Sequence, residues 1–389
     1  MISVKIGSGK SIDYEVVNSC LFYNKLTLEF SFSDGRIIKS SLLPNRVSFA
    51  KNKKLINEKI ALFEKRFNRK AKIVNPKRII FIEYFLYYFC LVVKNIFVKL
   101  LMPNQWIIAY RKIGDKDWKF IEFKRNELMA DPFIYYHDNK YYVFYESLNY
   151  DIDQGYIAVG ELNTEKNKII NIKKAIDEDY HLSFPYIFKI NFELYMIPES
   201  SENHTIDLYK CTKFPYKWDK VKTLINNIKA VDTVLIKNGK MWYLLTSEKV
   251  CGASYGDELT IFTSEDPLTK SFQRLSNIPA VHDVALARNA GSIYMNKTGN
   301  LYRVSQDCSR RYGYKVNVMK INQLSENEYR EELISKFDLP KNTIAMHTYN
   351  FANEIEITDL KIINKDIVSL VRNAIRIFKK IIIRLMNYN

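Results

Sequence analysis

A motif of two strands recurs about every fifty residues along the middle of this chain. Each copy has a short opener, a strand, an Asn- or Gly-bearing turn and a second, aromatic strand. The copies run from Asp131-Pro132-Phe133 to Glu146, from Phe184-Pro185-Tyr186 to Glu199 and from Asp232-Thr233-Val234 to Glu248. Strand-built repeats of this length are typical of stacked blades, so the motif predicts a β-propeller. In such a ring the innermost strands start at the central axis, and we expect the chemistry there.

The repeats fall within residues 105–362, which we expect to form one five-bladed propeller. The other strands of the ring are expected near 106–110, 118–123, 284–304 and 314–356. Residues 1–75 are predicted to form a small α/β unit, because they combine alternating stretches with an apolar pattern at helical spacing. The expected fold class is therefore mainly β.

Two amphipathic helices are predicted beside the propeller, at residues 79–102 and 366–386. The first, in a segment spanning 76–104, has nearly the length of a bilayer span, but Glu83 and two lysines interrupt its apolar residues. A helix in the membrane interface, a buried core helix and a true span all fit it. The second, in a segment spanning 363–389, is basic. It fits either an anionic membrane surface or the propeller rim.

The charge balance is strongly basic, with a net charge of +16 and a pI near 9.3. Such a balance attracts anionic lipids or substrates, although an AT-rich genome would also enrich lysine. No nucleic-acid recognition module accompanies the charge, so no nucleic-acid partner is expected. The five cysteines are scattered, and the start of the chain lacks a secretory signal pattern. We therefore expect a cytoplasmic protein, peripheral to the inner face of the cell membrane.

Asp131 and Asp232 occupy equivalent places in the first and third copies, since each precedes the aromatic pair of the next strand by the same number of residues. A propeller would bring them together at the axis, where paired carboxylates can act on a glycosidic bond. The alternative is that each aspartate caps a turn. Glu146 and Glu199 end second strands, which return to the rim where the openers lie. We therefore count all four acids as candidate catalytic residues.

The candidate substrate-binding residues lie near later blade edges: His282, Arg288, Asn289, Gln306, Asp307 and His347. An arginine at the axis can hold a phosphate or carboxylate, or it can only neutralise the axial acids. A lone histidine is more often structural. Asp151-Ile152-Asp153 has the acid-x-acid pattern of metal-bound nucleotide sites, but it occurs in a predicted loop and is common by chance. No metal-ligand or phosphate-loop motif occurs, so neither a metal nor a cofactor is expected.

These motifs also resemble a known family. The series includes Ala130-Asp131-Pro132-Phe133, Ser183-Phe184-Pro185, Asp232-Thr233, Arg288-Asn289-Ala290-Gly291, Gln306-Asp307, Tyr312-Gly313 and His347-Thr348. It resembles the N-terminal domain of plant glucosamine inositolphosphorylceramide transferases and their bacterial relatives. That domain is similar to the five-bladed propellers of furanosidase-type glycoside hydrolases. The resemblance implies axial roles for Asp131 and Asp232, but the hydrolases' acidic Glu of blade four has no counterpart between residues 281 and 291.

The first functional hypothesis is therefore a carbohydrate-active enzyme of cell-surface polysaccharide or glycolipid biosynthesis. A glycosyltransferase would take a sugar donor, nucleotide- or lipid-linked, and a glycan acceptor at the cytoplasmic membrane face. Two alternatives stay open: a glycoside hydrolase or phosphorylase of the five-bladed class, and a non-catalytic glycan-binding module. The plant relatives carry a separate transferase domain, so the resemblance implies a carbohydrate-active propeller more firmly than a reaction.

Overall fold

Five four-stranded antiparallel sheets follow one another in the computed structural model, which describes residues 1–46, 48–75, 82–124, 127–149, 154–364, 370–371 and 374–375. The first contains β7 (Glu127–His137), β8 (Lys140–Asn149), β9 (Gly155–Asn163) and β10 (Lys168–Ile176). The second contains β11 (Ser183–Ile190), β12 (Glu193–Ser200), β13 (Thr205–Lys213) and β14 (Lys217–Asn226), with a short 3₁₀ turn at Ser201–Asn203. The third contains β15 (Ala230–Asn238), β16 (Met241–Glu248), β17 (Thr260–Ser264) and β18 (Gln273–Arg274).

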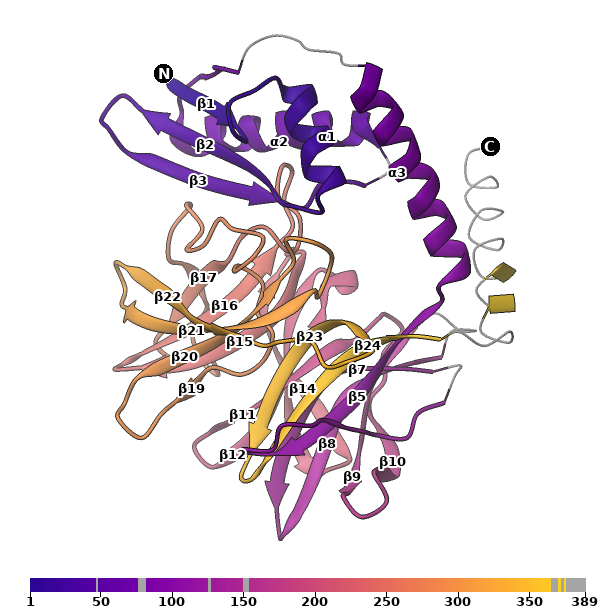
Figure 1. Ribbon diagram of the computed structural model, residues 1–389. Coiled ribbons are helices and arrows are strands. Elements are labelled where there is room, and N and C mark those ends of the chain that lie inside the picture. The colour runs from indigo at the N-terminus through magenta and orange to yellow at the C-terminus, as the bar shows by residue number, and fades with distance from the viewer. Residues whose placement is uncertain are drawn as a thin grey trace.

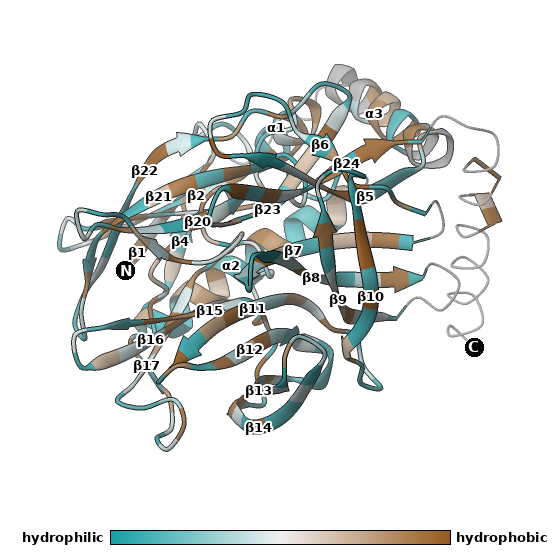
Figure 2. Ribbon diagram, turned by 90° about the horizontal axis from the view of Figure 1, so that it is seen from below, coloured by the Kyte–Doolittle hydropathy of each residue, from teal (hydrophilic) through white to brown (hydrophobic). Residues whose placement is uncertain are grey.

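The fourth sheet contains β19 (Tyr294–Met295), β20 (Leu301–Asp307), β21 (Lys315–Leu324) and β22 (Tyr329–Lys336). The fifth joins the two ends of the ring, because β23 (Thr343–Ala352) and β24 (Ile355–Ile363) pair with β5 (Asn104–Lys112) and β6 (Lys119–Phe120). The β24–β5 ladder runs from Ile355 opposite Lys112 to Ile363 opposite Asn104. Figure 2 shows the five sheets around a common centre. The predicted five-bladed propeller and its closing strands are confirmed.

The innermost strands share one backbone feature, a break in register at the opener. It falls between Ala130 and Phe133 in β7, Ser183 and Tyr186 in β11, Val231 and Val234 in β15, and Met346 and Tyr349 in β23. In three of these bulges the first residue has a positive φ: 49° at Asp131, 43° at Phe184 and 51° at Asp232. Residues other than glycine rarely adopt this conformation, and such strain clusters at functional sites. The bulges thus give the repeated openers a shared, unusual backbone.

The N-terminal unit is the α/β unit that was predicted, and it consists of a four-stranded sheet covered by two helices. Its sheet order is β3-β2-β1-β4, formed by β1 (Ile2–Ile6), β2 (Leu26–Phe32), β3 (Ile37–Leu42) and β4 (Ala71–Ile73). The helices are α1 (Ile12–Leu21) and α2 (Phe49–Phe67). Alternate residues of β1 and β2 are buried, and Phe30 stacks on Phe63 of α2 with ring centroids 3.7 Å apart. This alternation places the apolar side chains of the sheet against the helix.

Buried ion pairs hold the N-terminal unit on the propeller. Lys59 Nζ lies 2.8 Å from Glu258 Oε1, and Arg66 Nη2 lies 2.7 Å from Glu258 Oε2. Burial opposes the ionised carboxyl of Glu258, but Arg66 and Lys59 outweigh it and lower its pKa to about 2. Gly252, at φ 88°, approaches so closely that an added Cβ would lie 2.3 Å from the carbonyl oxygen of Glu58. The loop after β16 therefore docks directly on α2.

A long helix, α3 (Ile82–Leu101), leads from the N-terminal unit to β5 along one side of the molecule (Figure 1). It contacts the unit through Asn95, which accepts a hydrogen bond of 3.3 Å from the Tyr23 hydroxyl. Four of its apolar side chains are exposed: Leu86, Phe89, Val93 and Val98. Among the described residues, no helix combines the length and the apolar character needed to cross a membrane. Most of the predicted 366–386 helix lies outside these residues, although 370–371 and 374–375 are helical.

Candidate active site

A cavity of about 320 Å³ opens at the propeller axis. Six ionisable side chains line it: Asp131, Glu146, His181, Glu199, Arg288 and His347. Trp106, Tyr255 and Tyr312 add aromatic walls. Ligand pockets for small molecules begin at about 300 Å³, so this space suits a group the size of a monosaccharide. Asp131, Glu146, Glu199, Arg288 and His347, all predicted site residues, are thus brought to one cavity.

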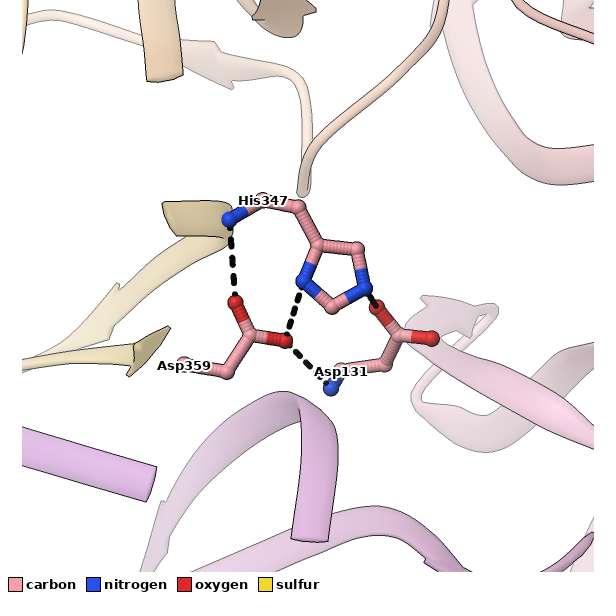
Figure 3. Close-up of side chains that lie close together, drawn as sticks. All are labelled: Asp131, His347 and Asp359. Carbon is pink, nitrogen blue, oxygen red and sulfur yellow. Dashed lines mark hydrogen bonds and ion pairs between the residues drawn. The ribbon is translucent and has the colours of Figure 1, made fainter. Parts of the chain in front are cut away.

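Asp131 belongs to a buried network with His347 and Asp359 (Figure 3). Its Oδ1 lies 3.2 Å from His347 Nε2 and accepts a hydrogen bond of 2.6 Å from the Thr348 hydroxyl. On the other side of the imidazole, Nδ1 lies 2.6 Å from Asp359 Oδ2. Asp359 also accepts bonds from the backbone N–H groups of Asp131, His347 and Thr348. Among the described residues nothing bonds to Asp131 Oδ2, so that oxygen is available to a substrate.

Asp131 and His347 differ in how the protein environment shifts their protonation. Burial raises the pKa of Asp131 to about 7, and the nearby carboxylates add to this effect while His347 opposes it. Burial also disfavours a charged imidazole at His347, but Asp359 and Asp131 prevail and raise its pKa to about 9. His347 is therefore a cation at neutral pH, and Asp131 is poised between its two protonation states. Trp106 stacks on the imidazole at 4.1 Å and fixes its plane.

These three groups also lie close enough together to share a small cation, since their ligand atoms are within 4.8 Å of one another. The histidine ring, however, stands between the two carboxylates and directs one nitrogen at each (Figure 3). With a pKa of about 9, the imidazolium itself supplies the positive charge that a metal would bring. We therefore interpret the cluster as a charge network.

Asp232 lies beneath the cavity and is held by three side chains. Arg288 donates to both of its carboxylate oxygens, and Gln306 Nε2 donates to Oδ2 over 2.8 Å. Asn289 donates to the backbone carbonyl of Asp232 over 2.7 Å. Arg288 in turn lies over the ring of Tyr312, 4.8 Å from its centroid. Of the two roles expected for Arg288, this geometry supports neutralising an axial acid, because its fork is already engaged.

Glu199 provides a second carboxyl group with a shifted pKa. It ends β12 and accepts a hydrogen bond of 3.1 Å from Ser183, while Arg288 Nη2 lies 4.0 Å away. Burial raises its pKa to about 8, and the neighbouring Asp232 and Asp131 contribute to this rise. At neutral pH Glu199 is therefore mostly protonated. It can therefore donate a proton.

Glu146 is paired with a histidine that the sequence analysis did not select. His181 Nε2 lies 3.1 Å from Glu146 Oε1, and its Nδ1 accepts a hydrogen bond of 3.1 Å from Gly155 N–H. Burial opposes charging of His181, but the carboxylates around it raise its pKa to about 9. The Gly155 bond requires an unprotonated Nδ1, so it works against that rise. Its position just before the Ser183-Phe184-Pro185 opener could have indicated that His181 lies near the axis.

Carboxyl groups outnumber potential cations at the axis. Five buried or nearly buried carboxyl groups face only three possible cations: Asp131, Glu146, Glu199, Asp232 and Asp359 against His181, Arg288 and His347. Burial is the main cause of the raised pKa values of Asp131 and Glu199, and the neighbouring carboxyl groups add to it. An acidic cavity also stabilises the positive charge that develops on a sugar ring when its glycosidic bond breaks.

The other predicted residues lie elsewhere. Asn289 and Gln306 are fully buried and support Asp232 from below. His282 packs against Phe63 of the N-terminal unit, outside the axial cavity, and burial lowers its pKa to about 4. Asp307 lines a different cavity, at the end of blade four. The acid-x-acid motif at 151–153 lies outside the described residues. Asp359 was missed because β24 had offered no motif.

The fold and this cavity together define a five-bladed β-propeller with an acidic axial pocket. The chain belongs to the family "Glucosamine inositolphosphorylceramide transferase 1, N-terminal", whose model matches residues 107–372, which confirms the family expected from the motifs.

Plant proteins with the name of this family are similar to the chain in sequence. The chain is 35% identical over 208 residues to glucosamine inositolphosphorylceramide transferase 1 of Oryza sativa subsp. japonica, a match that covers 53% of this chain and 28% of the relative. The Arabidopsis thaliana protein of that name is 33% identical over 207 residues, covering 53% and 27%. The matched region thus spans just over a quarter of these relatives' length.

Solved structures of propeller glycosidases are also similar. The catalytic domain of a Coprinopsis cinerea GH62 α-L-arabinofuranosidase is 10% identical with a TM-score of 0.44, covering 60% of this chain and 90% of that one. An exo-β-1,3-galactanase from Clostridium thermocellum is 16% identical with a TM-score of 0.43, covering 59% of each chain.

Proposed function

We propose that this chain is a glycosyltransferase, or the carbohydrate-active part of one, in the biosynthesis of cell-surface glycolipid or polysaccharide. The observation that carries the proposal is the axial pair Asp131 and Glu199. Asp131 is buried and the Glu199 side chain is 15% exposed. Both have raised pKa values, and both keep one carboxyl oxygen without a partner among the described residues. Membership of a family described as transferases favours transfer over hydrolysis.

In this mechanism the acceptor hydroxyl loses its proton to Asp131. A pKa of about 7 suits a general base that works near neutral pH. The acceptor oxygen then bonds to the anomeric carbon of the donor, and the bond to the leaving oxygen breaks with its electron pair. Glu199 gives its proton to that oxygen. Asp232 remains an ion pair with Arg288 and holds that guanidinium in place beside the cavity.

Hydrolysis is the second candidate, and one observation favours it. Glu199 supplies the protonated acid that the blade-four stretch lacks, so water in place of the acceptor would complete a hydrolase site. A phosphorylase would use phosphate at that position. The two candidates share residues and differ only in the nucleophile, so product analysis separates them.

The test compares wild-type protein with Asp131→Asn and Glu199→Gln. Glu193→Gln is the matched control, because Glu193 lies on the same strand as Glu199 but half-exposed at its other end. Membrane extracts with labelled sugar donors report transfer, and aryl glycosides report hydrolysis. We expect both site variants to lose at least about a hundredfold in rate while the control keeps it. Full activity of both site variants would refute catalysis at the axis. Glycan binding without turnover of any donor would identify a binding module.

We further propose that the protein works on the cytoplasmic membrane surface. The exposed apolar side chains of α3 and the net charge of +16 support binding to an anionic bilayer. Phe89→Ser with Val93→Ser should weaken sedimentation with vesicles containing phosphatidylglycerol. Phe192→Ser is the control, because Phe192 is 98% exposed in the β11–β12 turn. Equal vesicle binding by all three proteins would exclude α3 as the contact.

A further inference from the structure

A second cavity, of about 460 Å³, lies between the N-terminal unit and blade four. Four of the residues that line it are basic: Lys25, Arg310, Lys315 and Lys336. The hydroxyl-bearing Ser309 and Tyr314 and the amide of Asn24 lie beside them. Its single acidic lining residue is Asp307. We call this space the basic pocket.

The cations of the basic pocket are only partly neutralised. Lys25 pairs with Asp283, and Lys315 Nζ lies 2.9 Å from Asp338, whose side chain is 97% exposed. Lys336 Nζ lies 3.7 Å from Asp307, a loose contact. Among the described residues no carboxylate pairs with Arg310, whose side-chain contact is the Tyr314 hydroxyl at 3.2 Å. The lining therefore keeps positive charge for an anionic ligand.

The backbone at this pocket is held in place from the N-terminal unit. Arg46 donates to the carbonyl of Arg310 over 3.0 Å and to the carbonyl of Ser19 at the end of α1. Lys25 and Ser41 both bind Asp283, so the unit and blade four are also tied on the neighbouring side. These contacts fix the backbone that carries the pocket's side chains, so anion binding would not have to order the loop itself.

One loop separates the basic pocket from the axial cavity. It joins β20 to β21, and along it Arg310 and Tyr314 line the basic pocket whereas Tyr312 lines the axial cavity. Gly313 anchors the loop, because its carbonyl accepts a hydrogen bond of 3.0 Å from Met346 N–H. Its φ of 60° and its contact with His347, where an added Cβ would lie 2.5 Å from Cβ, leave no room for another residue. A ligand that crosses this loop would reach both spaces.

The two cavities suit different groups of one substrate: the axial cavity suits an uncharged group, and the basic pocket suits an anionic group. In the axial cavity each cationic side chain already contacts a carboxyl group: His181 lies beside Glu146, Arg288 beside Asp232 and His347 beside Asp131. The cavity therefore suits a neutral sugar better than a phosphate. We propose that the basic pocket binds the phosphate group of the substrate, a diphosphate or phosphodiester, whose sugar occupies the axial cavity. The inference rests on the proposed function and adds a location: the phosphate of a phosphate-linked donor or acceptor lies outside the axial cavity, between blade four and the N-terminal unit. Both kinds of substrate contain the anionic oxygens that arginine and lysine bind.

The phosphate could be free, as in a nucleotide, or part of a lipid headgroup. The pocket is close to α3, since Tyr23, one residue before Asn24, contacts Asn95 of that helix. The two sources are therefore tested in separate arms. Pyrophosphate titrated into the full chain in a calorimeter probes free phosphate. Flotation with phosphatidylcholine vesicles, with and without phosphatidylinositol, probes an anionic lipid phosphodiester, because phosphatidylcholine has no net charge.

Arg310→Gln with Lys315→Gln removes two of the four cations. The matched control is Lys240→Gln with Lys297→Gln, which removes the same charge from exposed turns of blades three and four. We expect the pocket variant to bind pyrophosphate, or the phosphatidylinositol vesicles, at least about tenfold more weakly, and the control to bind as the wild type does. Loss in the pyrophosphate arm indicates a free phosphate; loss only in the vesicle arm indicates a lipid phosphate.

Two results would overturn the proposal: no phosphate-dependent binding in either arm, or equal losses in the pocket variant and the control. The catalytic variant Asp131→Asn separates this inference from the proposed function, because it should stop transfer and keep phosphate binding. If Asp131→Asn weakened phosphate binding as much as the pocket variant does, the phosphate would belong in the axial cavity. If binding followed the prediction but no sugar were transferred, the proposed function alone would fail.

Discussion

The charge of His347 gives the sharpest prediction about this site. Its side chain is 2% exposed between two aspartates, and its pKa is raised from 6.5 to about 9. A raised histidine pKa means that the folded chain binds the proton more tightly. The resulting stability is fully present below pH 6.5 and is lost as the pH rises through 9. The difference corresponds to about 3 kcal/mol. His347→Gln should remove this contribution and leave a polar side chain of similar size.

Urea denaturation at several pH values between 6 and 10 measures the effect. We expect the stability difference between His347→Gln and the wild type to be up to about 3 kcal/mol larger at pH 6.5 than above pH 9, where only the pH-independent cost of the lost packing remains. Protonation of Asp131 in the variant would relieve part of the loss at the acidic end. The wild-type curve alone is not diagnostic, because other buried acids titrate in the same range. The difference between the two proteins isolates the histidine.

His282→Gln is the matched control. His282 is also buried, but its pKa is lowered to about 4, so it stays neutral over the whole range. Its replacement should cost a pH-independent amount, set by lost packing against Phe63. If the His347 difference stayed constant from pH 6 to 10, as the control's should, His347 would not be an imidazolium and the charge network would be wrong.

Three further predictions follow from the same contacts. Glu258→Gln leaves Lys59 buried without its main partner and should cost about 3 kcal/mol in urea denaturation at pH 7. Because the Glu258 pKa is lowered to about 2, this stability is present above pH 4.5 and is lost as the pH falls toward 2, so the difference should narrow there. Gly313→Ala should cost about 2 kcal/mol by urea denaturation, since its positive φ and its contact with His347 both oppose a methyl group. In transfer assays the basic limb of the pH profile should report a group near pH 8, and Glu199→Gln should remove that limb.

The sequence predicted the fold of this protein more completely than its site. A strand repeat is visible as a local sequence pattern. The blades, the closing strands and the N-terminal unit could therefore be predicted from periodicity and turn residues. Aligning the copies of the repeat also predicted that Asp131 and Asp232 lie near the axis, because equivalent positions of propeller blades converge there. His181 and Asp359 escaped notice, since neither is in a repeated motif. His282 and Asp307 lie away from the axis, because the blade-four opener at 284–291 is mostly irregular and breaks the repeat.

The sequence by itself determined the ring of five blades and brought Asp131 and Asp232 to its axis. Only the tertiary structure decided the state of each group there. Asp232 is neutralised by Arg288, whereas Asp131 and Glu199 have burial and neighbouring acids that raise their pKa values. These states depend on distances between residues that are far apart in the chain. Electrostatic energy varies with separation and burial, which no local pattern encodes.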